Sequence, residues 1–267
     1  MPIADFSDRS IFDLLNLSGR CAVVTGGGSG IGLAIARRLA EAGCDVVLVD
    51  IDRTAAEKAA VELAESYGRH VIAVEGDVSD PAYPAAAIDA AQGIAGRLDI
   101  WVNNAGICHP HPLSELSAAE WDRTHHVDLR GAFLGAQAAS NTMIAAGTQG
   151  VILNMVSVSG FRGRPGHAHY TAAKHGVVGL TKSLAIELGP YNIRVLGIAP
   201  TLVATEGQRR HASGQGTAVN DAVAKTIALG RVAVPDDVAR VAVFLTSDLA
   251  AFMTGSTVFV DGGSGAF

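Results

Sequence analysis

Short apolar runs alternate with longer stretches of helical spacing along almost the whole chain of 267 residues. The apolar runs are rich in valine and isoleucine, and we expect strands over residues 21–26, 45–50, 70–77, 98–106, 150–157, 192–200 and 256–263. The stretches between them predict helices over residues 31–43, 54–68, 81–96, 117–147, 168–190 and 236–247. Strands that alternate with helices favour parallel βαβ units. The pattern therefore predicts one α/β domain over residues 1–267, with a doubly wound parallel sheet of about seven strands and helices on both faces.

Two stretches fall outside this alternation. Residues 1–17 precede the first strand and are expected to form an N-terminal arm. Residues 201–218 follow a strand and have no regular pattern of their own. An irregular segment of that length in a compact domain is usually functional or disordered. Because it follows the carboxyl end of a strand, where ligands bind in open α/β folds, we expect it to be a substrate lid.

Composition narrows the class of protein. The formal net charge is −6 and no dense cluster of lysine and arginine occurs, so nucleic acid is not expected as a partner. No apolar run approaches the ~18 residues that a membrane-spanning helix needs, so no membrane association is expected. The three cysteines are scattered without a CxxC motif, and the first residues lack a signal-peptide pattern. We therefore expect a soluble protein of the reducing cytoplasm.

Tyr170 and Lys174 stand four residues apart in a stretch of helical composition, which places them on one helix face. A phenol ionises near pH ~10, and a neighbouring cation lowers its pKa by ~1–3 units. Lys174 is thus expected to make Tyr170 an acid or base that works near neutral pH. Ser157 closes an apolar run upstream, so its hydroxyl is expected at the sheet edge where ligands bind. A tyrosine and a lysine four residues apart are also common on helices without any catalytic role. Whether this pair is catalytic depends on the other motifs of the chain.

A glycine-rich turn, TGGGSGIG from Thr25 to Gly32, joins the first strand to the first helix. Glycines at this point let backbone N–H groups approach a pyrophosphate, and the helix N-terminus favours its negative charge. The glycines at 26, 30 and 32 do not have the strict GxGxxG spacing, and no GK[ST] follows, which excludes a P-loop. A merely tight strand–helix turn is the alternative.

Asp50 ends the second expected strand, eighteen residues after Gly32. A carboxylate at this position can accept hydrogen bonds from both ribose hydroxyls of NAD and would repel the 2′-phosphate of NADP, so NAD is the expected cofactor. Asp77 ends the third strand, where it could meet the adenine amino group or simply cap the next helix.

These pieces resemble the classical short-chain dehydrogenase/reductase family from about residue 18 to residue 263. The matching segments are TGGGSGIG at 25–32, GDV at 76–78, NNAG at 103–106, Ser157, YTAAK at 170–174 and DGG at 261–263. The resemblance implies a Rossmann-type fold and an enzyme that transfers a hydride between nicotinamide C4 and an alcohol or carbonyl carbon. It also implies that Tyr170 is the general acid/base, that Lys174 lowers its pKa and holds the nicotinamide ribose, and that Ser157 orients the substrate oxygen.

The cofactor site that the resemblance and the motifs together predict is extensive. It comprises Gly26, Ser29, Gly30, Ile31, Gly32, Asp50, Asp77, Val78, Asn104, Ala105, Gly106, Tyr170, Lys174, Pro200, Val203 and Thr205.

The chain departs from the family pattern at three places. Asp128 stands where the family usually has an asparagine that holds a water molecule linking the lysine to solvent. We count Asp128 among the catalytic residues. An aspartate can also bind that water, but it adds a charge that could pair with Lys174 and weaken the pull of that lysine on Tyr170, so we expect activity to survive with an altered pH profile. Pro200-Thr201 replaces the usual Pro-Gly, and Leu196-Gly197 replaces a usual asparagine in the sixth strand, which affects the placement of loops more than the chemistry.

The substrate is expected to meet a polar surface. Its candidate residues are His109, His111, Arg162, Arg164, His167, Glu206, Arg209, Arg210 and His211. The segment CHPHP offers no closed ligand set, so no metal is expected. The run at 209–211 could receive an anionic substrate or be a solvated face. The polar surroundings favour polyols, sugars or other small secondary alcohols.

Two alternatives stay open. A 3-oxoacyl or other bulky-ketone reductase would be favoured by NADPH use, against which Asp50 argues. A non-catalytic nucleotide-binding regulatory protein would tend to lose Ser157, Tyr170 or Lys174, all of which are present.

The expected assembly is a homotetramer. The helices at 117–147 and 167–190 carry small and apolar residues on more than one face, as does the stretch near the C-terminus. Two different twofold interfaces would give D2 symmetry, which the resemblance also implies.

Overall fold

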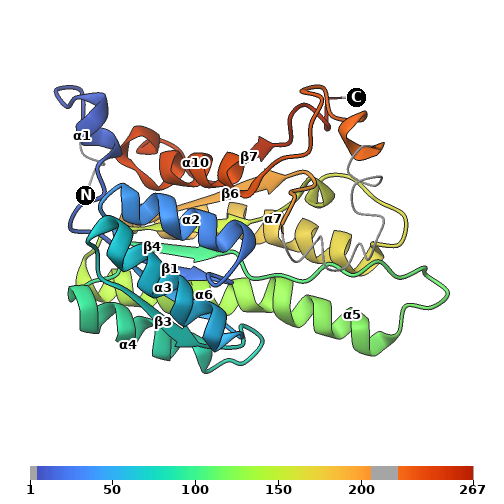
Figure 1. The fold of residues 1–267 in the computed structure, drawn as a ribbon, viewed down its shortest axis with the longest axis horizontal. Helices are drawn as coiled ribbons and strands as arrows, with labels where there is room; N and C mark the ends of the chain where they lie inside the picture. Colours follow the sequence, from blue (N-terminus) through green and yellow to red (C-terminus); the bar gives the residue numbers. More distant parts are fainter. Residues whose placement is uncertain (1–4, 206–221, 267) are drawn as a thin grey trace.

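A seven-stranded parallel sheet organises the part of the chain that the computed structural model describes, residues 5–205 and 222–266 (Figure 1). Its strand order is β3-β2-β1-β4-β5-β6-β7. The strands are β1 (Cys21–Thr25), β2 (Asp45–Asp50), β3 (Val71–Glu75), β4 (Ile100–Asn103), β5 (Val151–Met155), β6 (Arg194–Pro200) and β7 (Thr257–Val260). The order reverses between β1 and β4, and in such sheets the carboxyl ends at the reversal form the ligand crevice.

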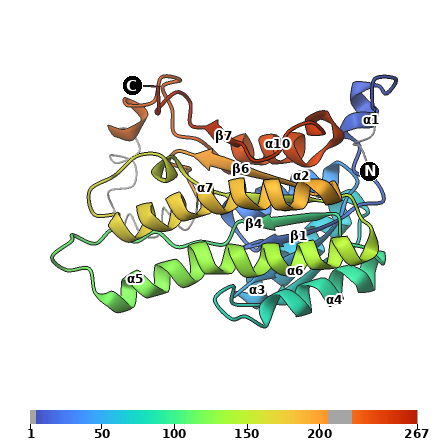
Figure 2. The ribbon, with the colours of Figure 1, turned by 180° about the vertical axis from the view of Figure 1, so that it is seen from behind.

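Helices cover both faces of the sheet, as the two opposite views show (Figures 1 and 2). One face carries α2 (Gly30–Glu41), α3 (Arg53–Tyr67) and α10 (Pro235–Thr246), and the other carries α4 (Tyr83–Ala95), α6 (Gly131–Ala146) and α7 (Ala168–Leu188). Alternate side chains of a strand point to opposite faces. In β2, Val46 and Leu48 therefore join the core under α2 and α3, whereas Val47 and Val49 join the core under α4.

The predicted strands and helices are confirmed within a few residues at their ends, and three features are additional. The expected helix over 117–147 is divided into α5 (Ala118–His125), a π-helical turn η1 (His126–Arg130) and α6. The expected arm contains a short helix α1 (Ile11–Leu15), capped by Ser10. Short 3-10 turns occur at η2 (Val158–Gly160), η3 (Gly189–Tyr191) and η4 (Asp248–Ala250). Most of the expected lid, residues 206–218, lies outside the described residues.

A chain of buried polar side chains joins the middle of the sheet to α6 and α7. The indole N–H of Trp101 donates to Asn103 Oδ1 at 2.7 Å, and the Asn103 amide donates to Ala132 O and to Asn154 Oδ1. Asn154, which is fully buried, donates in turn to Thr181 Oγ1 at 2.9 Å. Buried polar groups are tolerated when they are paired in this way. The network sets α6 and α7 in register with β4 and β5, whose carboxyl ends carry the site.

Candidate active site

The glycine-rich turn lies against the loop that follows β4. Gly26 and Gly30 have positive φ values of 63° and 56°, which glycine adopts without strain. The Asn104 amide donates to Thr25 O at 2.8 Å, and Asn104 N donates to the Thr25 hydroxyl. A Cβ on Gly26 would lie only 2.9 Å from Asn104 Nδ2. The absence of a side chain at Gly26 thus lets the two loops approach each other, and the absence of one at Gly30 makes room for Thr205.

Asp50 is held in one orientation at the end of β2. Its Oδ2 accepts from Gly28 N at 2.9 Å, and its Oδ1 accepts from Asp52 N at 3.0 Å. A Cβ on Gly28 would lie 3.0 Å from Oδ2, so the glycine makes room for the carboxylate. A carboxylate fixed by two backbone N–H groups is already oriented for a ligand that donates hydrogen bonds.

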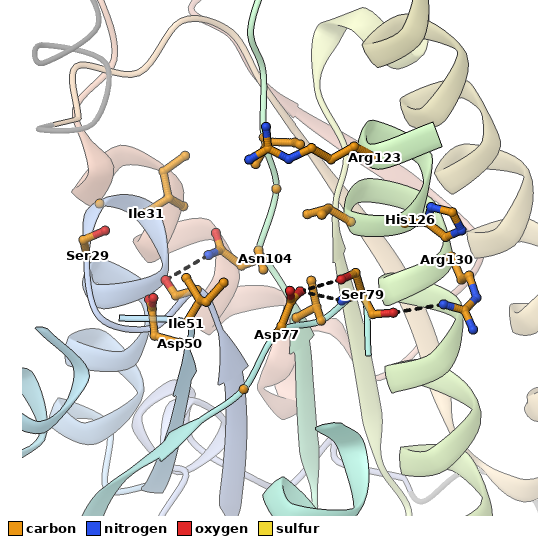
Figure 3. A pocket seen from close by; sticks show the side chains of 18 of the residues that line it. Ser29, Ile31, Asp50, Ile51, Asp77, Ser79, Asn104, Arg123, His126 and Arg130 are labelled. Atoms are coloured by element: carbon orange, nitrogen blue, oxygen red, sulfur yellow. Dashed lines mark hydrogen bonds between the residues drawn. The ribbon is translucent and has the colours of Figure 1, made fainter. Parts of the chain in front are cut away.

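A cavity of about 790 Å³ occupies the carboxyl ends of β1 to β4. Figure 3 shows Ser29, Ile31 and Asp50 on one side of it, Arg123 and His126 on the other, and Asn104 between them. Eleven of the predicted cofactor residues line it: Gly26, Ser29, Gly30, Ile31, Asp50, Asp77, Val78, Asn104, Ala105, Gly106 and Thr205.

The cavity has a wall that the sequence interpretation missed. Arg123, His126, Val127 and Arg130 line it from α5 and η1, and Arg130 donates to Ser79 O at 2.9 Å. These positions are three or four residues apart, so they share one helix face. Their spacing, together with the presence of Asp128 in the same stretch, could have indicated from the sequence that these residues face the site.

Five of the predicted cofactor residues do not line this cavity: Gly32, Pro200, Val203, and Tyr170 and Lys174, which lie on α7. Gly32 is buried in the first turn of α2, where the Gly26 carbonyl approaches it closely, so its role is packing between the turn and the helix. Pro200 ends β6, and Val203 forms a β-bridge with Ala233.

Asp77 lines the cavity, but its carboxylate accepts from both the backbone N–H and the hydroxyl of Ser79, and it does not cap α4 (Figure 3).

Ser157, Tyr170 and Lys174 come together at the carboxyl end of β5. Tyr170 and Lys174 occupy the first two turns of α7, and Lys174 Nζ is 5.5 Å from the centre of the Tyr170 ring. Lys174 Nζ also donates to Met155 O, the last carbonyl of β5, at 3.0 Å. Ser157 follows that strand, its hydroxyl accepts from Ser159 N at 3.1 Å, and it is close enough to Tyr170 to lower the pKa of the phenol by hydrogen bonding. The predicted pairing of Tyr170 and Lys174 on one helix face is confirmed.

The predicted direction of the Tyr170 pKa is wrong for the protein alone. Burial raises the pKa of Tyr170 to about 12, and this effect exceeds the lowering by Lys174. Asp128 and Cys108 raise it further. The sequence indicates the positive charge of Lys174 and the opposing charge of Asp128. It does not indicate how far the phenol is removed from solvent, and that loss of solvent disfavours the charged form of Tyr170.

The predicted ion pair between Asp128 and Lys174 is confirmed. Asp128 Oδ1 lies 3.0 Å from Lys174 Nζ, and both side chains are buried. Burial lowers the pKa of Lys174, but the attraction and hydrogen bond of Asp128, together with the attraction of Tyr170 and Cys108, outweigh burial and keep the pKa above its usual value. Lys174 therefore carries its charge, but beside an opposite charge.

The histidines of the loop after β4 fasten that loop to its neighbours. His169 Nε2 donates to His109 O at 3.0 Å, and His111 N donates to Gly166 O at 2.8 Å. The rings of His109 and His111 lie 3.9 and 3.8 Å from Glu120 Oε1.

Two further candidates for the substrate surface are also engaged in hydrogen bonds. His167 is buried and its ring bonds Pro165 O, while Arg162 donates to Ser264 O. Of the remaining candidates for the substrate surface, Arg164 lies in the described segment after η2, and Glu206, Arg209, Arg210 and His211 lie outside the described residues.

Comparison with known proteins shows the family. A protein-family model described as Enoyl-(Acyl carrier protein) reductase matches residues 26–265. The chain is 42% identical over 248 residues to a D-threitol dehydrogenase of Mycolicibacterium smegmatis, covering 92% of this chain and 93% of that protein. It is 36% identical over 251 residues to a 3-oxoacyl-[acyl-carrier-protein] reductase of Chlamydia trachomatis, covering 92% and 98%. The crystal structure of a putative short-chain alcohol dehydrogenase from Sinorhizobium meliloti superposes with a TM-score of 0.88 at 37% identity, covering 95% of this chain and 99% of that one.

The chain belongs to the classical short-chain dehydrogenase/reductase family. It is an oxidoreductase that interconverts alcohols and ketones, and enzymes of this family use a nicotinamide cofactor. The residues of the cavity fit such a group, because the glycine turn provides a cradle that a Cβ at Gly26 would fill and Asp50 offers a fixed acceptor for hydroxyl groups. Among the described residues no helix is long and apolar enough to cross a bilayer.

Proposed function

We propose that this protein is an NAD-dependent dehydrogenase that oxidises a polyol, a sugar or another small secondary alcohol, and reduces the matching ketone in the reverse direction. The observation that carries the proposal is the cluster of Ser157, Tyr170 and Lys174 at the carboxyl end of β5, beside the crevice between β1 and β4.

The proposed oxidation removes a proton and a hydride from the alcohol and transfers them to two different acceptors. The Ser157 hydroxyl and the Tyr170 phenolate bind the alcohol oxygen, and Tyr170 takes the hydroxyl proton. A nicotinamide held by the glycine turn and Asp50 would supply the hydride acceptor that the oxidation of the carbinol carbon needs. Lys174 stabilises the phenolate that starts the oxidation. Reduction runs the same steps backwards, with Tyr170 donating its proton.

The preference for NAD rests on Asp50. Its carboxylate faces the cavity and is fixed by Gly28 N and Asp52 N, so it accepts hydrogen bonds from ribose hydroxyls without reorganisation. A 2′-phosphate on the same ribose would meet a like charge.

The substrate class rests on similarity and on polarity. A relative with 42% identity is named D-threitol dehydrogenase, which acts on a polyol. The loop after β4 places His109 and His111 near the start of α7, which suits hydroxylated substrates better than a long acyl chain.

The mechanism is tested by Tyr170→Phe. We expect this variant to lose about 10²- to 10⁴-fold in kcat, because the proton acceptor is absent, while NAD binding stays within a few-fold of wild type. NADH formation from a panel of polyols, sugars and hydroxy acids gives the rate, and quenching of tryptophan fluorescence by NAD gives the affinity. Tyr191→Phe is the matched control, since Tyr191 is an exposed tyrosine beyond the end of α7. Turnover of Tyr170→Phe close to wild type would refute the assigned role.

A second candidate is the reduction of 3-oxoacyl or other bulky ketones. The description of the matching family model and the Chlamydia relative favour it. Ketone reduction with NADPH, combined with no oxidation of any polyol by NAD, would select this candidate.

We also propose a cytoplasmic homotetramer. The exposed apolar side chains include Phe133 and Ile186 on α6 and α7, and Phe252 and Phe259 beside and on β7. Two separate twofold interfaces generate D2 symmetry.

A further inference from the structure

Asp128 is a carboxylate fixed within the protein interior. It lies in the π turn η1, and its side chain is fully buried. Oδ1 is 3.0 Å from Lys174 Nζ, and Oδ2 accepts from Ile107 N at 3.0 Å. A Cβ on Gly106 would lie 2.7 Å from Oδ1, so the carboxylate reaches this position only because residue 106 is glycine. Two elements and a glycine thus hold one carboxylate oxygen against the ammonium group.

The ion pair changes the charge that Tyr170 experiences. Lys174 alone would present a buried positive charge to the phenol, whereas Lys174 with Asp128 presents a neutral pair. When Tyr170 loses its proton, a negative charge appears beside a neutral pair instead of beside a lone cation. A nearby opposite charge favours ionisation and a like charge opposes it. In agreement, Lys174 lowers and Asp128 raises the pKa of Tyr170.

We propose that Asp128 is a positioning residue that offsets the charge of Lys174 and so, in addition to burial, opposes the ionisation of Tyr170 and favours its protonated, proton-donating form. This inference rests on the proposed function, since it assigns Tyr170 the proton transfer. It predicts that carbonyl reduction proceeds at neutral pH, whereas alcohol oxidation accelerates as the solution becomes alkaline.

Other charged and titratable groups near Tyr170 do not supply this effect. Ser157 lowers the pKa of Tyr170. Cys108 raises that pKa only as a thiolate, and burial raises the pKa of the Cys108 thiol to about 11, so the thiol is neutral at neutral pH. The His167 ring centre is 6.5 Å from that of Tyr170, and burial lowers the pKa of His167. Arg164, from the segment after η2, acts on Cys108 and His167. Asp128 is therefore the carboxylate through which the described residues oppose Lys174.

The reaction balance shows why the proton matters. In oxidation the alcohol loses a hydride to the nicotinamide and a proton to the Tyr170 oxygen, so a phenolate must be present first. In reduction the carbonyl carbon gains the hydride, and the carbonyl oxygen gains the Tyr170 proton. Below the pKa of Tyr170, each pH unit costs oxidation about tenfold in rate and leaves reduction unaffected.

Asp128→Asn tests the inference, because it removes the charge and keeps the size of the side chain. Lys174 keeps Met155 O as an acceptor and gains the new amide oxygen, so we expect it to stay protonated. The ionisation of Tyr170 is read as tyrosinate absorbance at pH values up to ~11, taken as the difference between each protein and the same protein carrying Tyr170→Phe. We expect the midpoint of the Tyr170 titration to lie about 1 pH unit or more lower in Asp128→Asn than in wild type. For each pH unit by which the midpoint falls, the rate of alcohol oxidation at pH 7 should rise about tenfold, while the rate of carbonyl reduction at that pH should change little.

The matched control is Asp99→Asn. Asp99 is also a buried carboxylate in an ion pair, with Arg97, but it precedes β4 at the opposite end of the sheet. We expect Asp99→Asn to leave the midpoint of the Tyr170 titration unchanged. Thermal unfolding shows whether each variant is folded, and Asp128→Ser replaces Asp128→Asn if the latter is not.

The outcomes separate the two proposals. An unchanged or upward Tyr170 titration in folded Asp128→Asn overturns the role of Asp128, whatever the activity. A downward titration in a protein that oxidises no alcohol leaves the role of Asp128 standing and overturns the proposed function.

Discussion

At the scale of single residues, the proposed preference for NAD depends on Asp50. Its two oxygens are already occupied on one side by Gly28 N and Asp52 N, so the remaining lone pairs face the cavity. Hydrogen bonds to charged groups contribute about 1.5–3 kcal/mol, roughly a tenfold to hundredfold change in binding.

We expect Asp50→Asn to lower kcat/KM with NAD about tenfold or more and to raise kcat/KM with NADP, because the repulsion of the 2′-phosphate is removed. Steady-state kinetics with both cofactors measure the ratio. Asp52→Asn is the control, since Asp52 is a neighbouring carboxylate that caps α3 through Ala55 N, and it tests whether a more distant charge has the same effect. An unchanged NADP/NAD ratio in Asp50→Asn would contradict the cofactor assignment.

The proximity of Ser157, Tyr170 and Lys174 could be predicted from the sequence, because Tyr170 and Lys174 are four residues apart on one helix and Ser157 follows a strand. The direction of the Tyr170 pKa could not. It depends on burial by several segments and on charges from η1 and from the loop after β4, which are distant in the sequence. Spacing gives the partner on the same helix, whereas desolvation is a property of the packed site.

At the scale of elements, the π turn η1 is the feature that the sequence pattern concealed. Residues 117–147 have continuous helical spacing, and nothing in their composition indicates a turn with a different hydrogen-bond pattern. Such turns occur often at functional sites. Here the turn contains Asp128 and lies beside α7, so it places the carboxylate against Lys174.

The placement of α7 on the sheet depends on Asn154. We expect Asn154→Ala to lower the free energy of unfolding by about 2–4 kcal/mol, because Asn103 and Thr181 would each lose a buried hydrogen-bond partner. Urea unfolding followed by circular dichroism measures the change. Asn141→Ala on α6 is the control, since Asn141 is exposed and its loss should cost no more than ~0.5 kcal/mol. Equal stabilities for the two variants would show that the polar network does not hold the helices.

At the scale of the whole molecule, the doubly wound sheet was predictable because every strand is an apolar run and every crossover is a helix. The sheet order β3-β2-β1-β4-β5-β6-β7 gathers the ends of β1, β4 and β5 at one edge, and the glycine turn and Ser157 follow two of them. Motifs that are far apart in the chain are therefore brought together by the order of the strands and not by features of the motifs themselves. The paths of the loops, on which the substrate depends, do not follow from any hydrophobic periodicity in the sequence.

The assembly is the last property that belongs to this scale. Ile186 on α7 is 82% exposed and Phe252 near β7 is 93% exposed, values that are unfavourable for large apolar side chains in water. We expect wild type to have the mass of four 27.4-kDa chains in sedimentation equilibrium. Ile186→Asp and Phe252→Asp should each leave dimers, since each disrupts one of two twofold interfaces, and the double variant should leave monomers.

Val61→Asp introduces the same kind of charge on α3, on the opposite face of the sheet from α7, and should leave the tetramer intact. A monomeric wild type would refute the tetramer. Dissociation to monomers by either single substitution would show that one interface depends on the other. If the dimers retain NADH formation, the active site is complete within one chain, which agrees with the clustering of Ser157, Tyr170 and Lys174 in a single subunit. Loss of activity on dissociation would instead mean that contacts between subunits hold α7 in its working position.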